Sequence, residues 1–252
     1  MTGWLSALGP AGTALALLLL GHAMGDFVFQ TDRLARTKHR LRPLLSHGAI
    51  VLLVHIAAFL PLLTGRTAQL VAVVGLFHLL IDGVSARLRH GEAPSVGLFL
   101  GDQLAHLLVI VLAWFLIDPW AWAVSPAVTA LGGPERLPWA AITTGALYLS
   151  AFAFAHEGGN AIVRGVLPAE GPESKPEDDL EAGSLIGSLE RWIVLLLGFS
   201  GRWEAVALVI GAKSIARFEE LKQRAFAEYF LVGTLASVLV AIVLVVLVSA
   251  LV

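Results

Sequence analysis

The sequence predicts an all-α fold, a polytopic transmembrane helical bundle with about eight spans. Only 14% of the 252 residues are charged and 57% are hydrophobic, whereas soluble domains usually carry about 25% charged residues. Several stretches of about 20 apolar residues are long enough to cross ~30 Å of hydrocarbon as a helix. The alternating ten-residue pattern of a membrane β-barrel does not occur in the sequence. We therefore expect the lipid bilayer to be the main partner of this chain.

Four helices are expected in the first part of the chain, over residues 12–30, 44–63, 69–88 and 96–117. Each of them is a largely apolar run. The connections carry residues typical of turns, which are Pro43, Gly65 and Pro94. We assign residues 1–117 to a four-helix membrane bundle.

Four more helices are expected over residues 138–163, 184–200, 203–218 and 229–252. The last of them ends in the wholly apolar run VLVAIVLVVLVSALV, which requires only a hydrophobic environment. Residues 168–182 (PAEGPESKPEDDLEA) are acidic and rich in proline, a composition typical of an irregular loop. We assign residues 118–252 to a second four-helix membrane half that contains this acidic loop.

The distribution of lysine and arginine predicts the orientation in the membrane. Cytoplasmic connections of membrane proteins carry an excess of these residues. The connections after the first, third, fifth and seventh helices hold twelve of them, and the other three connections hold three. We therefore expect a multi-pass protein of the inner (cytoplasmic) membrane with both termini outside. The N-terminus lacks a basic segment before its first apolar run, so we expect that helix to be retained rather than cleaved as a signal peptide.

Composition also excludes several classes of function. The formal net charge of −2 gives no strong attraction to polyanions, so we expect no nucleic acid partner. The chain has no cysteine, which excludes disulfides, zinc fingers and iron–sulfur clusters. Any metal site must therefore use nitrogen and oxygen ligands. No sequence feature specifies an oligomeric state.

Ionisable side chains inside the spans are the most informative residues, because burial in the membrane is costly unless they are paired or bound to a ligand. Three helices each carry a histidine and an aspartate four positions apart, which places both side chains on one helix face. These pairs are His22 with Asp26, His78 with Asp82, and Asp102 with His106. His47 opens the second helix. The predicted topology brings all seven residues to one level near the cytoplasmic face.

This layer predicts a site for a divalent metal, Zn, Mn or Fe, because imidazole and carboxylate groups are ligands of these ions. Helical bundles build such centres from paired ligands on successive helices. The candidate ligands suit one ion or two and are His22, Asp26, His47, His78, Asp82, Asp102 and His106. The candidate catalytic residues are the carboxylates, since one that does not bind metal can act as a general base; they are Asp26, Asp82 and Asp102. Neighbouring glycines are expected to let the helices approach closely, namely Gly21, Gly25 and Gly101.

Two other interpretations of the layer stay open. Intramembrane histidines and aspartates also form proton or ion paths in transporters. Alternatively, the His/Asp pairs only form hydrogen bonds between helices and brace the bundle.

The second half of the chain carries a different set of charges. Lys213 and Arg217 lie one turn apart on one helix face and can neutralise a phosphate. With Glu190 and Glu228 they form the candidate substrate-binding set. The alternative is an internal network of salt bridges in which Glu190, Glu219 or Glu228 balances the two cations.

The motifs resemble a bacterial membrane family labelled domain of unknown function 3307. In the first half the resemblance covers roughly residues 20–110 and lies in GHAMGDFVFQTDRLARTKH, LLSH, FHLLIDGVSARL and GDQLAHLL. The second half is similar to the longer members of that family in IGSLERW, AKSIARF and AEYFLVGTLAS. The family label implies no activity. The His/Asp helices are also loosely similar to membrane-embedded metal-dependent hydrolases predicted in bacteria.

Two functions follow as expectations. The first is a metal-dependent hydrolase that acts on an amphiphilic or phosphorylated lipid at the cytoplasmic face, with metal-activated water as the nucleophile. The alternative is a transporter or ion-coupled permease that uses the same residues as an ion or proton path. The sequence has no HExxH zinc-protease motif and no GxSxG serine elbow. A non-catalytic membrane scaffold is a third interpretation.

Overall fold

The computed structural model describes residues 3–89, 95–116, 124–167 and 177–252. These residues form helices and connecting turns, with no strand among them. The short elements are α1 (Trp4–Ala7), α3 (Asp32–Thr37), η1 (Leu60–Leu62), α7 (Pro126–Ala130), η2 (Pro134–Arg136) and η3 (Glu220–Lys222). The long helices are α2 (Pro10–Phe27), α4 (Leu41–Phe59), α5 (Gly65–Leu88), α6 (Val96–Phe115), α8 (Trp139–Val166), α9 (Glu177–Phe199), α10 (Trp203–Ala216) and α11 (Arg224–Leu251).

The all-α class is confirmed, and each predicted helix has a counterpart among the long helices of the described residues. The clearest difference lies at the start of α9. Residues 177–182 were predicted to belong to the acidic loop, but their backbone is already helical. Residues 168–176 of that predicted loop lie outside the described part of the chain.

Four helical segments in the described residues are long and apolar enough to cross a membrane, and they are Leu41–Leu62, Gly65–Leu88, Val96–Phe115 and Arg224–Leu251. The predicted count of eight spans is therefore larger than the number that meets this criterion. Helix α10 has only 14 residues, which corresponds to about 21 Å of helix and is shorter than the hydrocarbon layer. The part of the chain that the structure describes is thus all-α, with four candidate membrane spans.

Helix α5 has its polar side chains inside and its apolar side chains outside. His78 and Asp82 are buried, whereas Leu76, Leu80 and Val84 are each more than half exposed. A helix on the surface of a soluble protein has the opposite arrangement, with polar residues facing the solvent. An apolar outer face over a polar interior is consistent with a bilayer environment.

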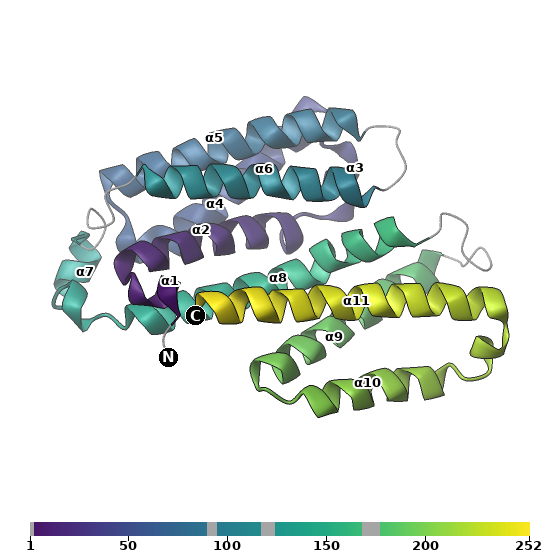
Figure 1. The fold of residues 1–252 in the computed structure, drawn as a ribbon. Coiled ribbons are helices and arrows are strands. Elements are labelled where there is room, and N and C mark those ends of the chain that lie inside the picture. Colours follow the sequence, from purple (N-terminus) through teal and green to yellow (C-terminus); the bar gives the residue numbers. More distant parts are fainter. Residues whose placement is uncertain (1–2, 90–94, 117–123, 168–176) are drawn as a thin grey trace. The chain divides into compact units, whose positions relative to one another are not determined.

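The chain divides into two compact units, and the division falls inside α8. The first unit holds Met1–Ala93, Gly97–Ala153 and Ala250–Val252, and the second holds Pro94–Val96 and Phe154–Ser249. The predicted domain boundary after residue 117 stays a prediction. In the first unit, α4 packs against both α2 and α5, and these helices run side by side with α6 (Figure 1).

Local sequence explains where the site-bearing helices begin. The hydroxyl of Thr64 accepts a hydrogen bond from the Thr67 amide, and the Thr67 hydroxyl accepts one from the Thr64 amide, so a capping box starts α5. Pro10 occupies the first turn of α2, where its missing N–H costs nothing. Thr31 caps the short helix α3 by accepting from the Leu34 amide at 3.3 Å.

The predicted role of glycine holds at two of three positions. A Cβ atom at Gly21 would lie 2.6 Å from the His55 ring, and one at Gly25 would lie 2.9 Å from Val51. Both glycines therefore permit the close approach of α2 and α4. The prediction is wrong for Gly101, because a Cβ there would meet nothing within 4 Å.

A fully buried arginine links the helices of the second unit to one another. Arg191 on α9 is 1% exposed, and its guanidinium donates to the backbone carbonyls of Ala155 and His156. It also donates to Asn160 Oδ1 on α8 and, at 3.1 Å, to Ser237 Oγ on α11. One side chain thus links three helices, with neutral oxygens in place of a carboxylate.

Candidate metal centre

The first unit gathers six of the seven predicted ligands into one buried cluster. Each of the four helices α2, α4, α5 and α6 contributes to it, and every member is less than a tenth exposed. The structure brings one nitrogen or oxygen atom of each member into overlapping groups whose atoms lie within 4.8 Å of one another. The groups are His22–Asp26–His106, Asp26–His47–His78 and His78–Asp82–His106. The antiparallel arrangement of these helices accounts for the common level of the ligands.

The densest part of the cluster contains four ligand atoms from α2, α4 and α5. Asp26 Oδ1 lies 3.2 Å from both His47 Nε2 and His78 Nε2. The two Nε2 atoms are themselves 3.2 Å apart. Asp82 Oδ2 lies 3.1 Å from His47 Nε2 and 3.4 Å from His78 Nε2. We call these four residues the N2O2 group.

Five separations, those from each carboxylate oxygen to the two nitrogens and that between the nitrogens, are close to the edges of a coordination tetrahedron. Zinc binds histidine nitrogen and carboxylate oxygen at about 2.0–2.2 Å, which makes neighbouring ligands in a tetrahedron roughly 3.3–3.6 Å apart. The five separations given for the N2O2 group range from 3.1 to 3.4 Å. The donor chemistry and the spacing both fit one divalent ion.

Two atoms of the N2O2 residues lack a hydrogen bond within the part of the chain that the structure describes, and one of them, Asp82 Oδ2, is a proposed ligand atom. Asp82 Oδ2 and His47 Nδ1 are buried and have no hydrogen-bond partner in the described residues. Buried polar atoms are normally satisfied, and each exception requires an explanation. An ion between the four residues would satisfy Asp82 Oδ2, which faces both imidazoles.

Lys38 belongs to the site, although in the sequence it is only one of the basic residues that predict the orientation in the membrane. It follows α3 and is 6% exposed, and its Nζ donates to Asp82 Oδ1 at 2.8 Å. Asp82 therefore directs one oxygen at a lysine and the other at the two histidines. A single lysine in a basic connection has no sequence signal that separates it from its solvated neighbours.

A second set of contacts surrounds His22 and His106. Their rings stack with centroids 4.9 Å apart. His22 Nε2 lies 3.2 Å from Gln103 Oε1, and His106 Nδ1 lies 2.9 Å from the backbone oxygen of Asp102. Gln103 was not predicted as a site residue, but an amide three positions before His106 in an otherwise apolar helix is a signal that sequence reasoning can use.

Asp102 is buried beside the cluster, but its carboxylate is outside the three groups. Its Oδ2 accepts from the Gln103 amide at 3.1 Å and lies 3.5 Å from Arg89 Nη2. Its Oδ1 is 3.9 Å from His106 Nδ1. Asp102 is therefore placed to orient other side chains.

The predicted substrate-binding residues form ion pairs in the second unit. Lys213 Nζ lies 2.6 Å from Glu190 Oε2, and both side chains are partly buried. Arg217 pairs with Glu220 at 3.3 Å, and Glu228 pairs with Arg224 at 2.8 Å. This pattern agrees with the salt-bridge alternative, with Glu190 in its expected role.

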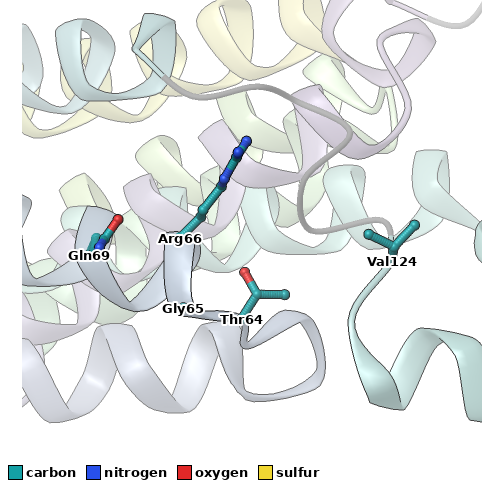
Figure 2. Close-up of a pocket in the computed structure, with 5 residues that line it drawn as sticks. All are labelled: Thr64, Gly65, Arg66, Gln69 and Val124. Atoms are coloured by element: carbon teal, nitrogen blue, oxygen red, sulfur yellow. The ribbon is translucent and has the colours of Figure 1, made fainter.

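A pocket lies at the start of α5 (Figure 2). It is lined by Thr64, Gly65, Arg66, Gln69 and Val124. His78 follows Gly65 by thirteen residues, which is about 20 Å along a helix. The pocket is therefore separate from the cluster.

Comparison with known proteins agrees with the resemblance seen in the sequence. Residues 14–130 match the model of a family described as protein of unknown function (DUF3307). No curated protein and no solved structure matches the chain. The match contains all six clustered ligands, Lys38 and Gln103, while the similarity inferred for the second half lies beyond it. The buried His/Asp cluster thus lies wholly within the part of the chain that matches this family model.

Proposed function

We propose that the N2O2 group, Asp26, His47, His78 and Asp82, binds a divalent metal ion of the Zn, Mn or Fe class. The observation that carries this proposal is the set of five ligand-to-ligand distances of 3.1–3.4 Å. Hydrogen bonds that only brace helices require one donor for each acceptor. In this cluster two imidazole nitrogens lie 3.2 Å from each other and 3.1–3.4 Å from the same two carboxylate oxygens, a donor set that suits a coordination site.

The charges around the group favour reaction with an anion. Asp26 and Asp82 carry two negative charges, and Lys38 offsets one of them. A bound divalent ion changes the local balance from one negative to one positive charge. A positive centre in a low-dielectric interior stabilises hydroxide or an anionic oxygen strongly.

We therefore propose that the protein is a metal-dependent membrane hydrolase. The metal would supply activated water, and the substrate class is an amphiphilic ester or phosphorylated lipid that enters from the bilayer. Asp26, Asp82 and Asp102 remain the candidates for catalytic carboxylates. In the second half, Lys213, Arg217, Glu190 and Glu228 remain a predicted anion-binding set that competes with the ion-pair interpretation.

The proposed setting is the inner membrane. Eight spans would require α2, α8, α9 and α10 to cross the bilayer together with the four candidate spans. Both termini would lie outside, and the His/Asp layer would lie near the cytoplasmic face. The four-helix halves 1–117 and 118–252 complete this proposal. Reporter fusions at the connections measure the orientation directly.

Elemental analysis of the purified protein tests metal binding. The protein is produced with a tag that binds no metal, and Zn, Mn and Fe are measured per chain. We expect one or two equivalents in the wild type and the loss of at least one in His78→Ala. His156→Ala is the matched control, because His156 lies in the other unit and is outside the described ligand groups. An unchanged metal content in His78→Ala would reject this ligand set.

Hydrolysis is tested with metal-loaded protein in detergent and lipid-phosphate or lipid-ester substrates. We expect metal-dependent product release that falls at least 100-fold in Asp82→Asn. Metal-replete protein without activity on either class would leave a metal site but reject the hydrolase.

One observation favours the alternative of an ion or proton path. His55 is 1% exposed, and its Nδ1 donates to the Val51 carbonyl at 2.9 Å. Its Nε2 is buried without a hydrogen-bond partner in the described residues. His55 lies eight residues beyond His47, or about 12 Å further along α4, so this helix carries a second buried imidazole away from the cluster. A transporter would give flux in proteoliposomes that His55→Phe abolishes, whereas a hydrolase would give none.

A further inference from the structure

We infer that His22, Asp26 and His106 form a second cation position next to the N2O2 group, so that the site is dinuclear. This inference rests on the proposed metal binding at the N2O2 group. One nitrogen from each histidine and one Asp26 oxygen lie within 4.8 Å of one another. The second position thus has two histidines of its own and shares Asp26 with the N2O2 group.

The hydrogen bonds of His22 determine which nitrogen is available. The Gln103 amide nitrogen donates to Asp102 Oδ2 at 3.1 Å, so Gln103 Oε1 acts as an acceptor. His22 Nε2 must then carry the proton that it donates to Gln103. The lone pair of His22 resides on Nδ1, which is buried and has no partner in the described residues.

His106 is held in a similar way, but the roles of its two ring nitrogens are exchanged. Its Nδ1 lies 2.9 Å from the backbone oxygen of Asp102, and a carbonyl oxygen only accepts, so Nδ1 carries the proton. The lone pair resides on Nε2, which is also buried without a partner in the described part of the chain. Metal-bound histidines typically donate their other N–H to a carbonyl or a similar acceptor, which fixes the tautomer. Both histidines follow this pattern.

Asp26 connects the two positions. Its Oδ1 lies 3.2 Å from His47 Nε2 and His78 Nε2 of the N2O2 group. Its Oδ2 is directed at the other position, 3.9 Å from His22 Nδ1. A carboxylate with one oxygen in each group can bridge two metal ions about 3.5–4 Å apart, the usual spacing in two-metal hydrolases.

The two positions differ in their open coordination sites. The N2O2 group would supply four protein ligands, the number that a closed zinc site uses. The second position has three protein ligands and keeps at least one site for water or an anionic oxygen. A second divalent ion also adds two positive charges. Asp102 does not compensate these charges, because its carboxylate already lies 3.5 Å from Arg89 Nη2. The ligand of the second ion is therefore an anion such as hydroxide or a phosphoryl oxygen.

Metal stoichiometry and manganese spectroscopy together test this inference. Wild-type protein is loaded with Mn2+, dialysed, and examined by elemental analysis and electron paramagnetic resonance. We expect two equivalents and the spectrum of an exchange-coupled pair. His22→Ala should retain one equivalent and show the six-line spectrum of an isolated ion. His156→Gln is the matched control, because it replaces a histidine of the second unit that is outside the three groups.

The outcomes separate the two proposals. No bound manganese in the wild type would overturn both the N2O2 site and the second position. One equivalent in both wild type and His22→Ala would overturn the second position alone, as would two equivalents in both. Gln103→Leu gives an independent result if His22→Ala does not fold. It removes the acceptor that orients His22, together with the amide that donates to Asp102 Oδ2, and we expect the affinity of the weaker site to fall by about 10- to 100-fold with the tighter site unchanged.

Discussion

Replacing Lys38 by methionine should make the protein bind its metal more tightly while making the metal-free protein less stable. Lys38 Nζ lies 2.8 Å from Asp82 Oδ1, and both side chains are buried. Removing one partner of a buried ion pair typically costs about 3–5 kcal/mol, because the other charge is left uncompensated. Methionine keeps the volume of the lysine stem, so the change isolates the charge.

A bound divalent ion supplies the positive charge that Asp82 loses in Lys38→Met. The cost of the substitution in the metal-loaded protein should therefore fall to about 1 kcal/mol or less, because Asp82 is then compensated by the ion. Because metal binding and folding are linked, the difference between the cost in the metal-free protein and the cost in the metal-loaded protein appears as tighter metal binding by Lys38→Met. A difference of about 2–4 kcal/mol corresponds to roughly 30- to 700-fold tighter binding.

Two assays measure this prediction. Competition with a chromophoric chelator gives the metal affinity in detergent, and thermal unfolding is recorded with metal and with EDTA. We expect a lower melting temperature for Lys38→Met only in EDTA. Lys222→Met is the control, because Lys222 lies 2.7 Å from Glu219 in an exposed pair that contributes little. Unchanged or weaker metal binding by Lys38→Met would refute the reasoning, since Lys38 would then assist ligation rather than substitute for the ion.

Two further substitutions test the packing of the units. Gly21→Ala should destabilise the protein by about 1–3 kcal/mol, because its Cβ would lie 2.6 Å from the His55 ring. Gly101→Ala should leave the stability unchanged, since a Cβ there would meet nothing within 4 Å. Equal melting temperatures for the two variants would contradict this account. Arg191→Met should cost at least about 3 kcal/mol in chemical unfolding, because it leaves several buried acceptors without a donor. Arg164→Gln, at a side chain that is 54% exposed, should change stability little, and a similar loss in both variants would show that burial of Arg191 is not the cause.

The helices could be predicted because their apolar runs are long and their breaks carry proline or glycine. The start of α9 could not, since residues 177–182 are acidic and resemble a loop by composition, although their backbone is helical. Crossing the membrane is a separate question from being helical. The 14 residues of α10 show this, because they form a helix that is shorter than the hydrocarbon layer.

The site was predictable to the extent that it follows helix periodicity. Spacing of four residues placed His78 and Asp82 on one face, and antiparallel neighbours brought them to the level of His47. Periodicity does not specify which carboxylate faces inward. Asp102 has the same spacing to His106 as the other pairs, yet its carboxylate is directed at Gln103 and Arg89. Lys38 reaches the cluster through a turn after α3, and no helical pattern predicts that contact.

Anomalous diffraction from crystals of metal-replete protein tests the central claim most directly. The account predicts a peak at the absorption edge of the bound metal, about 2.0–2.2 Å from one atom each of Asp26, His47, His78 and Asp82. A dinuclear site adds a second peak beside His22 and His106, about 3.5–4 Å from the first. Metal-replete crystals without a peak among these side chains would contradict the claim that the cluster is a metal centre.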